Sequence, residues 1–137
     1  MTSMFLRLST TAAVLIMLLS VLSVFVLLRG HHAPGGGFAG GLLFAAAIAI
    51  QLLARGAAEA RRVLVFDPRT LVGVGLSLAA LAACLGIVVG RSLLAPLWGP
   101  ELPGVGRIGT VLLFDLAVYL IVAGTALTII FALTEEP

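Results

Sequence analysis

Four long apolar runs limit what this chain can fold into more than any other feature of the sequence. A helix needs about 20 apolar residues to cross a hydrocarbon core of about 30 Å. The runs have this length, and the expected spans are 8–28, 36–54, 71–90 and 108–133. They lack the apolar/polar alternation of a membrane barrel. The sequence therefore predicts an all-α integral membrane protein, with a single domain of four transmembrane helices over residues 1–137.

The composition excludes other classes of protein. Hydrophobic residues make up 61 % of the chain and charged residues only 10 %, whereas a soluble domain carries about 25 % charge. The net charge of +2 comes from scattered arginines, which do not form the basic stripe of a nucleic-acid-binding protein. The first run, flanked by Arg7, is long and has no A-x-A-like cleavage site, so we expect an uncleaved helix rather than a signal peptide.

The arginines also predict the orientation in the membrane, because cytoplasmic connections are enriched in basic residues. Five lie at the N-terminus and in the second connection: Arg7, Arg55, Arg61, Arg62 and Arg69. Three lie in the first and third connections: Arg29, Arg91 and Arg107. This balance favours an N-in/C-in arrangement. The second connection, with its apolar stretch 63–66, is expected at the membrane interface or against a neighbouring protein.

A glycine run stands at the start of the second span, in the segment from Pro34 through Gly35, Gly36 and Gly37 to Phe38. Proline fixes one backbone angle and glycine permits unusual ones, so this segment predicts a structural turn and close packing. An anion-binding nest is the alternative, but the run lacks the lysine and the Ser/Thr of a phosphate-binding loop.

Two adjacent histidines, His31 and His32, precede this turn. A metal site needs three or four ligands, and no cysteine or carboxylate is close in sequence. We therefore expect no metal and no cofactor. A hydrogen-bonding loop pair is the favoured interpretation, and proton entry at the mouth of a path is a weaker alternative, since histidine titrates near neutral pH.

Asp115 is the acidic residue well inside an expected span, eight residues after Arg107 and therefore about 12 Å along the helix. An ionisable group at such a depth is costly and usually marks a proton or ion route, or else bonds to a neighbouring helix. Tyr119 follows at i+4, where its hydroxyl group could reach Asp115, so both residues are candidates for an ion path. The sequence contains no arrangement typical of nucleophilic or acid–base catalysis, so an enzyme is not expected.

Two segments of the chain form recognisable motifs. One is Gly30-His31-His32-Ala33-Pro34-Gly35-Gly36-Gly37-Phe38 followed by Gly40-Gly41-Leu42, and the other is Leu113-Phe114-Asp115-Leu116-Ala117-Val118-Tyr119-Leu120. They resemble segments of a known family, the MnhB-type (MrpB) subunits of the Mrp (Mnh) multisubunit Na⁺/H⁺ antiporters. The Trp98-Gly99-Pro100 connection also fits, and the resemblance covers essentially the whole chain. His32 and Ala117 depart from the family pattern, which often has asparagine and glycine there.

The resemblance implies a hetero-oligomeric complex in a prokaryotic plasma membrane that exchanges Na⁺ for H⁺. Its large antiporter-like subunits would carry most of the ion path, and the MnhB-type subunit would be a small, required partner. By this resemblance Asp115 is assigned to the cation route and Pro34 to Phe38 to an essential turn. The alternative is a structural subunit of a related membrane-bound hydrogenase or respiratory-type complex. A small four-helix drug exporter fits less well, because the first helix has no acidic residue.

Overall fold

Four long helices account for most of the computed structural model, which describes residues 2–29, 36–88, 98–102 and 106–134. They are α1 (Thr2–Arg29), α2 (Gly36–Arg55), α4 (Pro68–Val88) and α5 (Thr110–Thr134). Four helical stretches are long and apolar enough to cross a membrane. The prediction of an all-α membrane protein with four spanning helices is confirmed. His31, His32, Pro34 and Gly35 lie outside the described residues.

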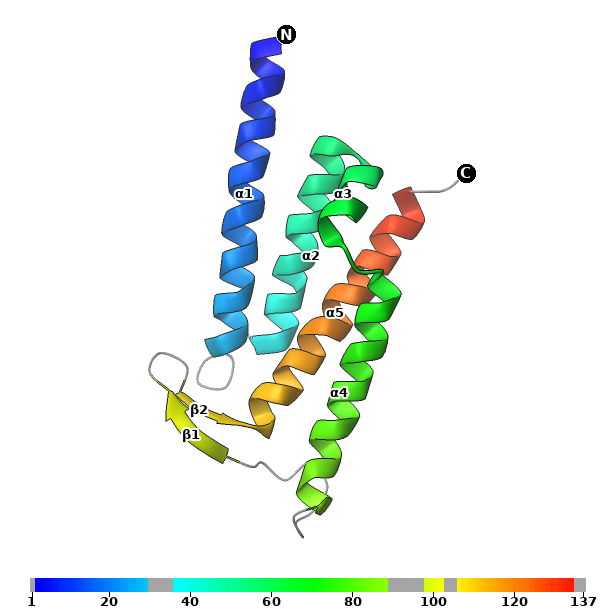
Figure 1. Cartoon of the computed structure of the whole chain (residues 1–137). Helices are drawn as coiled ribbons and strands as arrows, with labels where there is room; N and C mark the ends of the chain where they lie inside the picture. Colours follow the sequence, from blue (N-terminus) through cyan, green and yellow to red (C-terminus); the bar gives the residue numbers. More distant parts are fainter. Residues whose placement is uncertain (1, 30–35, 89–97, 103–105, 135–137) are drawn as a thin grey trace.

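The helices form a row rather than a square bundle (Figure 1). α2 packs between α1 and α5, and α4 packs on the other side of α5, so that α1 and α4 occupy the two edges. Consecutive connections place α1 antiparallel to α2, and α4 antiparallel to α5. The row leaves the outer faces of α1 and α4 without a neighbour within the described part of the chain.

The expected spans 8–28 and 36–54 lie inside α1 and α2. The fourth helix begins at Thr110 rather than at residue 108, because Gly106–Gly109 form strand β2. This strand pairs antiparallel with β1 (Trp98–Leu102). The proline- and glycine-rich connection thus separates the last two spans as expected, but it contains a hairpin that the sequence analysis did not predict.

A short helix, α3 (Ala57–Leu64), follows α2 after a turn at Gly56, whose φ of 90° favours glycine. α3 folds back between the ends of α2 and α5 (Figure 1). Its buried side chains Ala60 and Leu64 join the main apolar core. The other buried members of that core come from α2 and α5: Ala45, Ile48, Leu52, Leu127 and Phe131.

Arginine and glutamate side chains lie on the outer side of α3. The guanidinium group of Arg61 lies 4.5 Å from the centre of the Phe131 ring, a cation–π contact that ties α3 to the end of α5. Arg62 lies 3.8 Å from Glu59 on the exposed face. This charged face is consistent with a position near the lipid headgroups, while Leu64 at the other end of α3 reaches the core.

Candidate functional site

The glycine run of α2 lies directly against the segment of α5 that carries Asp115 and Tyr119. A Cβ atom on Gly37 would overlap the carbonyl oxygen of Asp115. A Cβ atom on Gly41 would come within 2.8 Å of the carbonyl oxygen of Tyr119. The two segments that carry the family resemblance therefore meet in space, and only glycine at these positions lets the backbones approach so closely.

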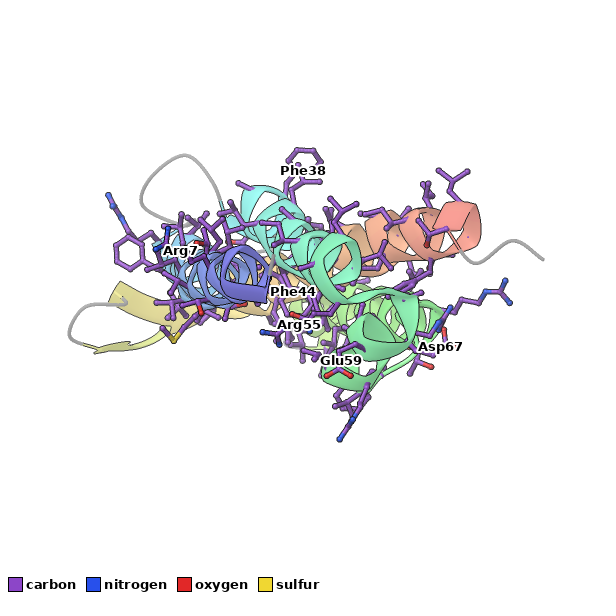
Figure 2. The ribbon with its side chains drawn as sticks, turned by 90° about the horizontal axis from the view of Figure 1, so that it is seen from above. Arg7, Phe38, Phe44, Arg55, Glu59 and Asp67 are labelled. Atoms are coloured by element: carbon purple, nitrogen blue, oxygen red, sulfur yellow. The ribbon has the colours of Figure 1, made fainter. Side chains whose placement is uncertain are left out.

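The first residues of α2 differ in conformation and in exposure. Gly36 has a φ of 74°, a left-handed conformation that favours glycine. Phe38 is 61 % exposed and points away from the bundle (Figure 2). The close packing therefore comes from Gly37 on the inner face, whereas Phe38 is available to lipid or to another chain.

Tyr119 anchors a buried polar contact between α1 and α5. Its hydroxyl oxygen lies 2.9 Å from Oγ of Ser23, which is fully buried. Oγ of Ser23 donates to the carbonyl oxygen of Ser20 at 2.7 Å. A serine hydroxyl has one proton, so the Tyr119 hydroxyl group is the donor of the pair. By sequence spacing this hydroxyl group could reach Asp115, and the structure shows it bonded to Ser23.

Gly40 makes room for the Tyr119 ring. A Cβ atom on Gly40 would meet the carbonyl oxygen of Ser23 at 2.8 Å and the Tyr119 ring at 3.0 Å. Phe44, one turn further along α2, places its ring centre 6.0 Å from that of Tyr119. Ser23, Gly40, Phe44 and Tyr119 thus form one contact cluster where α1, α2 and α5 meet.

Asp115 lies nearer to the end of its helix than the sequence suggested. Since α5 begins at Thr110, Asp115 is five residues from its start, about 8 Å along the axis rather than about 12 Å from Arg107. Its side chain is half-buried. Asp115 is thus three residues inside the candidate membrane span Leu112–Thr134, in the part of α5 that follows strand β2.

Two hydroxyl groups of the spanning helices bond within their own helix. The Thr128 hydroxyl group donates to the carbonyl oxygen of Gly124 at 2.7 Å, and Ser77 donates to Gly73 at 2.9 Å. By contrast, Gln51 is 3 % exposed, and its Nε2 has no hydrogen-bond partner among the residues that the structure describes.

Sequence reasoning missed two features of the described region. Ser23 was not singled out, because a serine in an apolar run carries no signal for a partner 96 residues away. Asp67 was assigned to an ordinary connection, although the Asp67–Pro68 pair is a helix-start signal. The described residues contain no group of three or more His, Cys, Asp or Glu side chains that could hold a metal ion.

Comparisons with known proteins agree with this geometry. The model of the MnhB family, described as "Domain related to MnhB subunit of Na+/H+ antiporter", matches residues 7–128. Over 132 residues the chain is 37 % identical to a B-type Na(+)/H(+) antiporter subunit of Bacillus subtilis strain 168, covering 94 % of this chain and 92 % of the relative. The corresponding antiporter subunit of Alkalihalophilus pseudofirmus is 33 % identical, with the same coverage.

A solved structure is also similar. A chain in the structure of the Mrp complex from Dietzia sp. DQ12-45-1b matches 99 % of this chain with a TM-score of 0.82 and 33 % sequence identity. This chain spans only 15 % of the length of that one. The fold, the family match over most of the sequence and the similarity to known antiporter subunits show that the chain belongs to the MnhB family of Na⁺/H⁺ antiporter subunits.

Proposed function

We propose that this chain is a small membrane subunit of a multisubunit Mrp-type Na⁺/H⁺ antiporter, and that Asp115 lies on the path of the transported cation. The relatives named above are antiporter subunits, which supports this function over a hydrogenase-type complex. The same relatives place the chain in a prokaryotic plasma membrane, with the other Mrp subunits as its partners. As a transporter component it would carry Na⁺ and H⁺ rather than catalyse a reaction.

The contact between Gly37 and the backbone of Asp115 is the observation that carries the assignment of Asp115. This contact holds the carboxylate-bearing turn of α5 against α2, so it fixes the place of Asp115 relative to α2. The carboxylate lies within one of the apolar spans, where an ionisable group is costly and is usually retained for transport. Tyr119, one turn further along, stabilises the same turn through Ser23.

Replacement of Asp115 tests the proposal. Asp115→Asn removes the charge and keeps the size of the side chain, so we expect the complex to assemble and antiport to fall by about tenfold or more, the factor that corresponds to a loss of about 1.4 kcal/mol. Asp115→Glu, which keeps the carboxylate, should retain more activity than Asp115→Asn.

Antiport is measured as Na⁺-dependent dissipation of a pH gradient in membrane vesicles, with the amount of assembled complex determined by co-purification. An assembled Asp115→Asn complex with unchanged antiport would show that Asp115 is not on the cation path. In that case the purely structural role of the subunit, favoured by the tight α2–α5 packing, would be the remaining function.

A further inference from the structure

Helices α3 and α4 form one interrupted segment. The candidate span Ala57–Leu85 covers α3 and most of α4. Its long apolar part belongs to α4, because α3 carries Glu59, Arg61 and Arg62. Regular helical structure stops at Leu64 and resumes at Pro68. Between them Val65 has a φ of 69°, which is a genuine outlier for a β-branched residue. The break is therefore a defined conformation of the backbone, located directly before the apolar helix α4.

The beginning of α4 is stabilised by Asp67. Its Oδ1 atom accepts a hydrogen bond from the backbone N–H of Arg69 at 2.9 Å. Its carbonyl oxygen accepts from the N–H groups of Thr70 and Leu71 at 3.0 and 3.2 Å. These bonds satisfy backbone donors that the first turn of a helix leaves open. They also hold the Asp67 carboxylate at the break.

Contacts with α5 show how deep the break lies. The carbonyl oxygen of Pro68 and the side chains of Leu71 and Val72 lie within 3.0 Å of a Cβ atom placed on Gly124. Gly124 is near the middle of the apolar stretch Leu112–Thr134. Along the axis of α5 it is about 15 to 18 Å from either end of that stretch. The start of α4, and the break just before it, therefore lie at the depth of the hydrocarbon core.

The break is nevertheless uncovered on its outer side. Val65 is 78 % exposed and Phe66 is 62 % exposed. Asp67 and Arg69 are also exposed, and Asp67 lies at the rim of the molecule when viewed from above (Figure 2). Irregular backbone is tolerated at membrane depth only where protein buries it or where it lines a water-filled cavity. A short acidic side chain in contact with lipid adds a further cost.

The exposed side chains favour protein over water as the cover, because Val65 and Phe66 are apolar and gain nothing from a hydrated cavity. Lipid tails would suit these two residues but not the carboxylate beside them. Arg69 does not require a polar partner at this depth, since its long side chain can extend toward the headgroups. A polypeptide surface that is apolar with one polar group satisfies all of these residues together.

We propose that the break at Val65–Asp67 is the docking site for a membrane-spanning segment of a neighbouring subunit of the antiporter complex. That segment packs apolar side chains on Val65 and Phe66 and donates a hydrogen bond to the carboxylate of Asp67. This inference rests on the proposed function, because it requires that the chain works as part of a complex.

Photo-crosslinking in the intact complex tests the docking site. Phe66 is replaced by the photoreactive analogue p-benzoylphenylalanine in cells that produce all subunits, and the membranes are irradiated before the complex is purified. We expect a covalent adduct with a co-purifying antiporter subunit, identified by mass spectrometry. If this variant does not assemble, the same replacement at Val63, which is 47 % exposed on the neighbouring turn, serves as the second position and should give the same adduct.

Thiol labelling distinguishes a protein cover from a water-filled cavity. In a Cys84→Ser background, Phe66→Cys is compared with Arg62→Cys, whose parent side chain is 81 % exposed on α3. We expect Phe66→Cys to react with a membrane-impermeant maleimide at least about tenfold more slowly than the reference, because protein excludes the reagent. Equal labelling rates would overturn the proposal, and so would an adduct at position 66 with lipid alone.

Failure of this inference can be told apart from failure of the proposed function. If the chain does not co-purify with any antiporter subunit, the proposed function and the docking site are both wrong. If the chain co-purifies and position 66 reacts only with lipid, the subunit assignment stands and the docking site alone is wrong.

Discussion

At Gly37, α2 approaches α5 so closely that a side chain would overlap the carbonyl oxygen of Asp115. Gly37→Ala should therefore push the two helices apart and destabilise the subunit by about 1–3 kcal/mol, the usual cost of overpacking. Gly73→Ala is the matched control, because a Cβ atom on Gly73 meets nothing within 4 Å. We expect a lower melting temperature and less assembled complex for the first variant only. Equal behaviour of the two variants would contradict the packing at Gly37.

The Ser23–Tyr119 hydrogen bond is the second contact to be tested at the level of single residues. A double-mutant cycle with Ser23→Ala and Tyr119→Phe should give a coupling energy of about 0.6 kcal/mol, the average for hydrogen bonds between membrane helices. Unfolding of the full chain in detergent micelles measures it. Additive effects of the two substitutions would show that the hydroxyl groups do not bond.

Among the elements, the interrupted segment α3–α4 departs most from expectation. The third span was expected to begin at residue 71, with the second connection before it at the membrane interface or against a neighbouring protein. Instead α4 begins at Pro68, next to Gly124 near the middle of α5. The physical reason is that Ala60 and Leu64 bury their side chains in the core, which draws α3 back along α5.

The conformation of Val65 gives a test at the scale of the element. Val65→Gly should be more stable than Val65→Ala, because both remove the same contacts but only glycine adopts a φ of 69° without steric cost. The expected difference is about 1 kcal/mol, because the cost of this strained backbone conformation for a residue with a Cβ atom exceeds the extra flexibility of glycine in the unfolded chain. Thermal unfolding of the two variants measures it. A less stable glycine variant would indicate that the break is not held in this conformation.

At the scale of the whole molecule, a row of four helices has two long outer faces that one chain cannot cover. α1 exposes several large apolar side chains along its length: Val14, Leu15, Met17, Leu18, Val21, Leu22, Val24 and Phe25. In water such a surface would cause aggregation, whereas in a membrane it meets lipid or other subunits. This shape suits a component of a larger assembly.

Orientation is also a property of the whole molecule, and the arginine distribution predicts N-in/C-in. A fluorescent reporter fused after Pro137 should fold on the cytoplasmic side, and a phosphatase reporter at the same position should be inactive. The thiol of an Arg62→Cys variant should likewise react only in inside-out vesicles, since α3 lies at the same end of the molecule as the C-terminal end of α5 (Figure 1). Labelling from the outside would reverse the assignment.

The sequence by itself determined the number of spanning helices and, through two short segments, the family. Span length follows from the thickness of the bilayer, which each segment meets independently of the others. Only the tertiary structure decided which groups meet: Tyr119 with Ser23 rather than Asp115, and the start of α4 with Gly124. These contacts depend on how closely helices cross, and in lipid this distance is set by small residues and side-chain packing rather than by hydrophobicity. The spacing of residues along one helix therefore did not predict which side chains of another helix they contact.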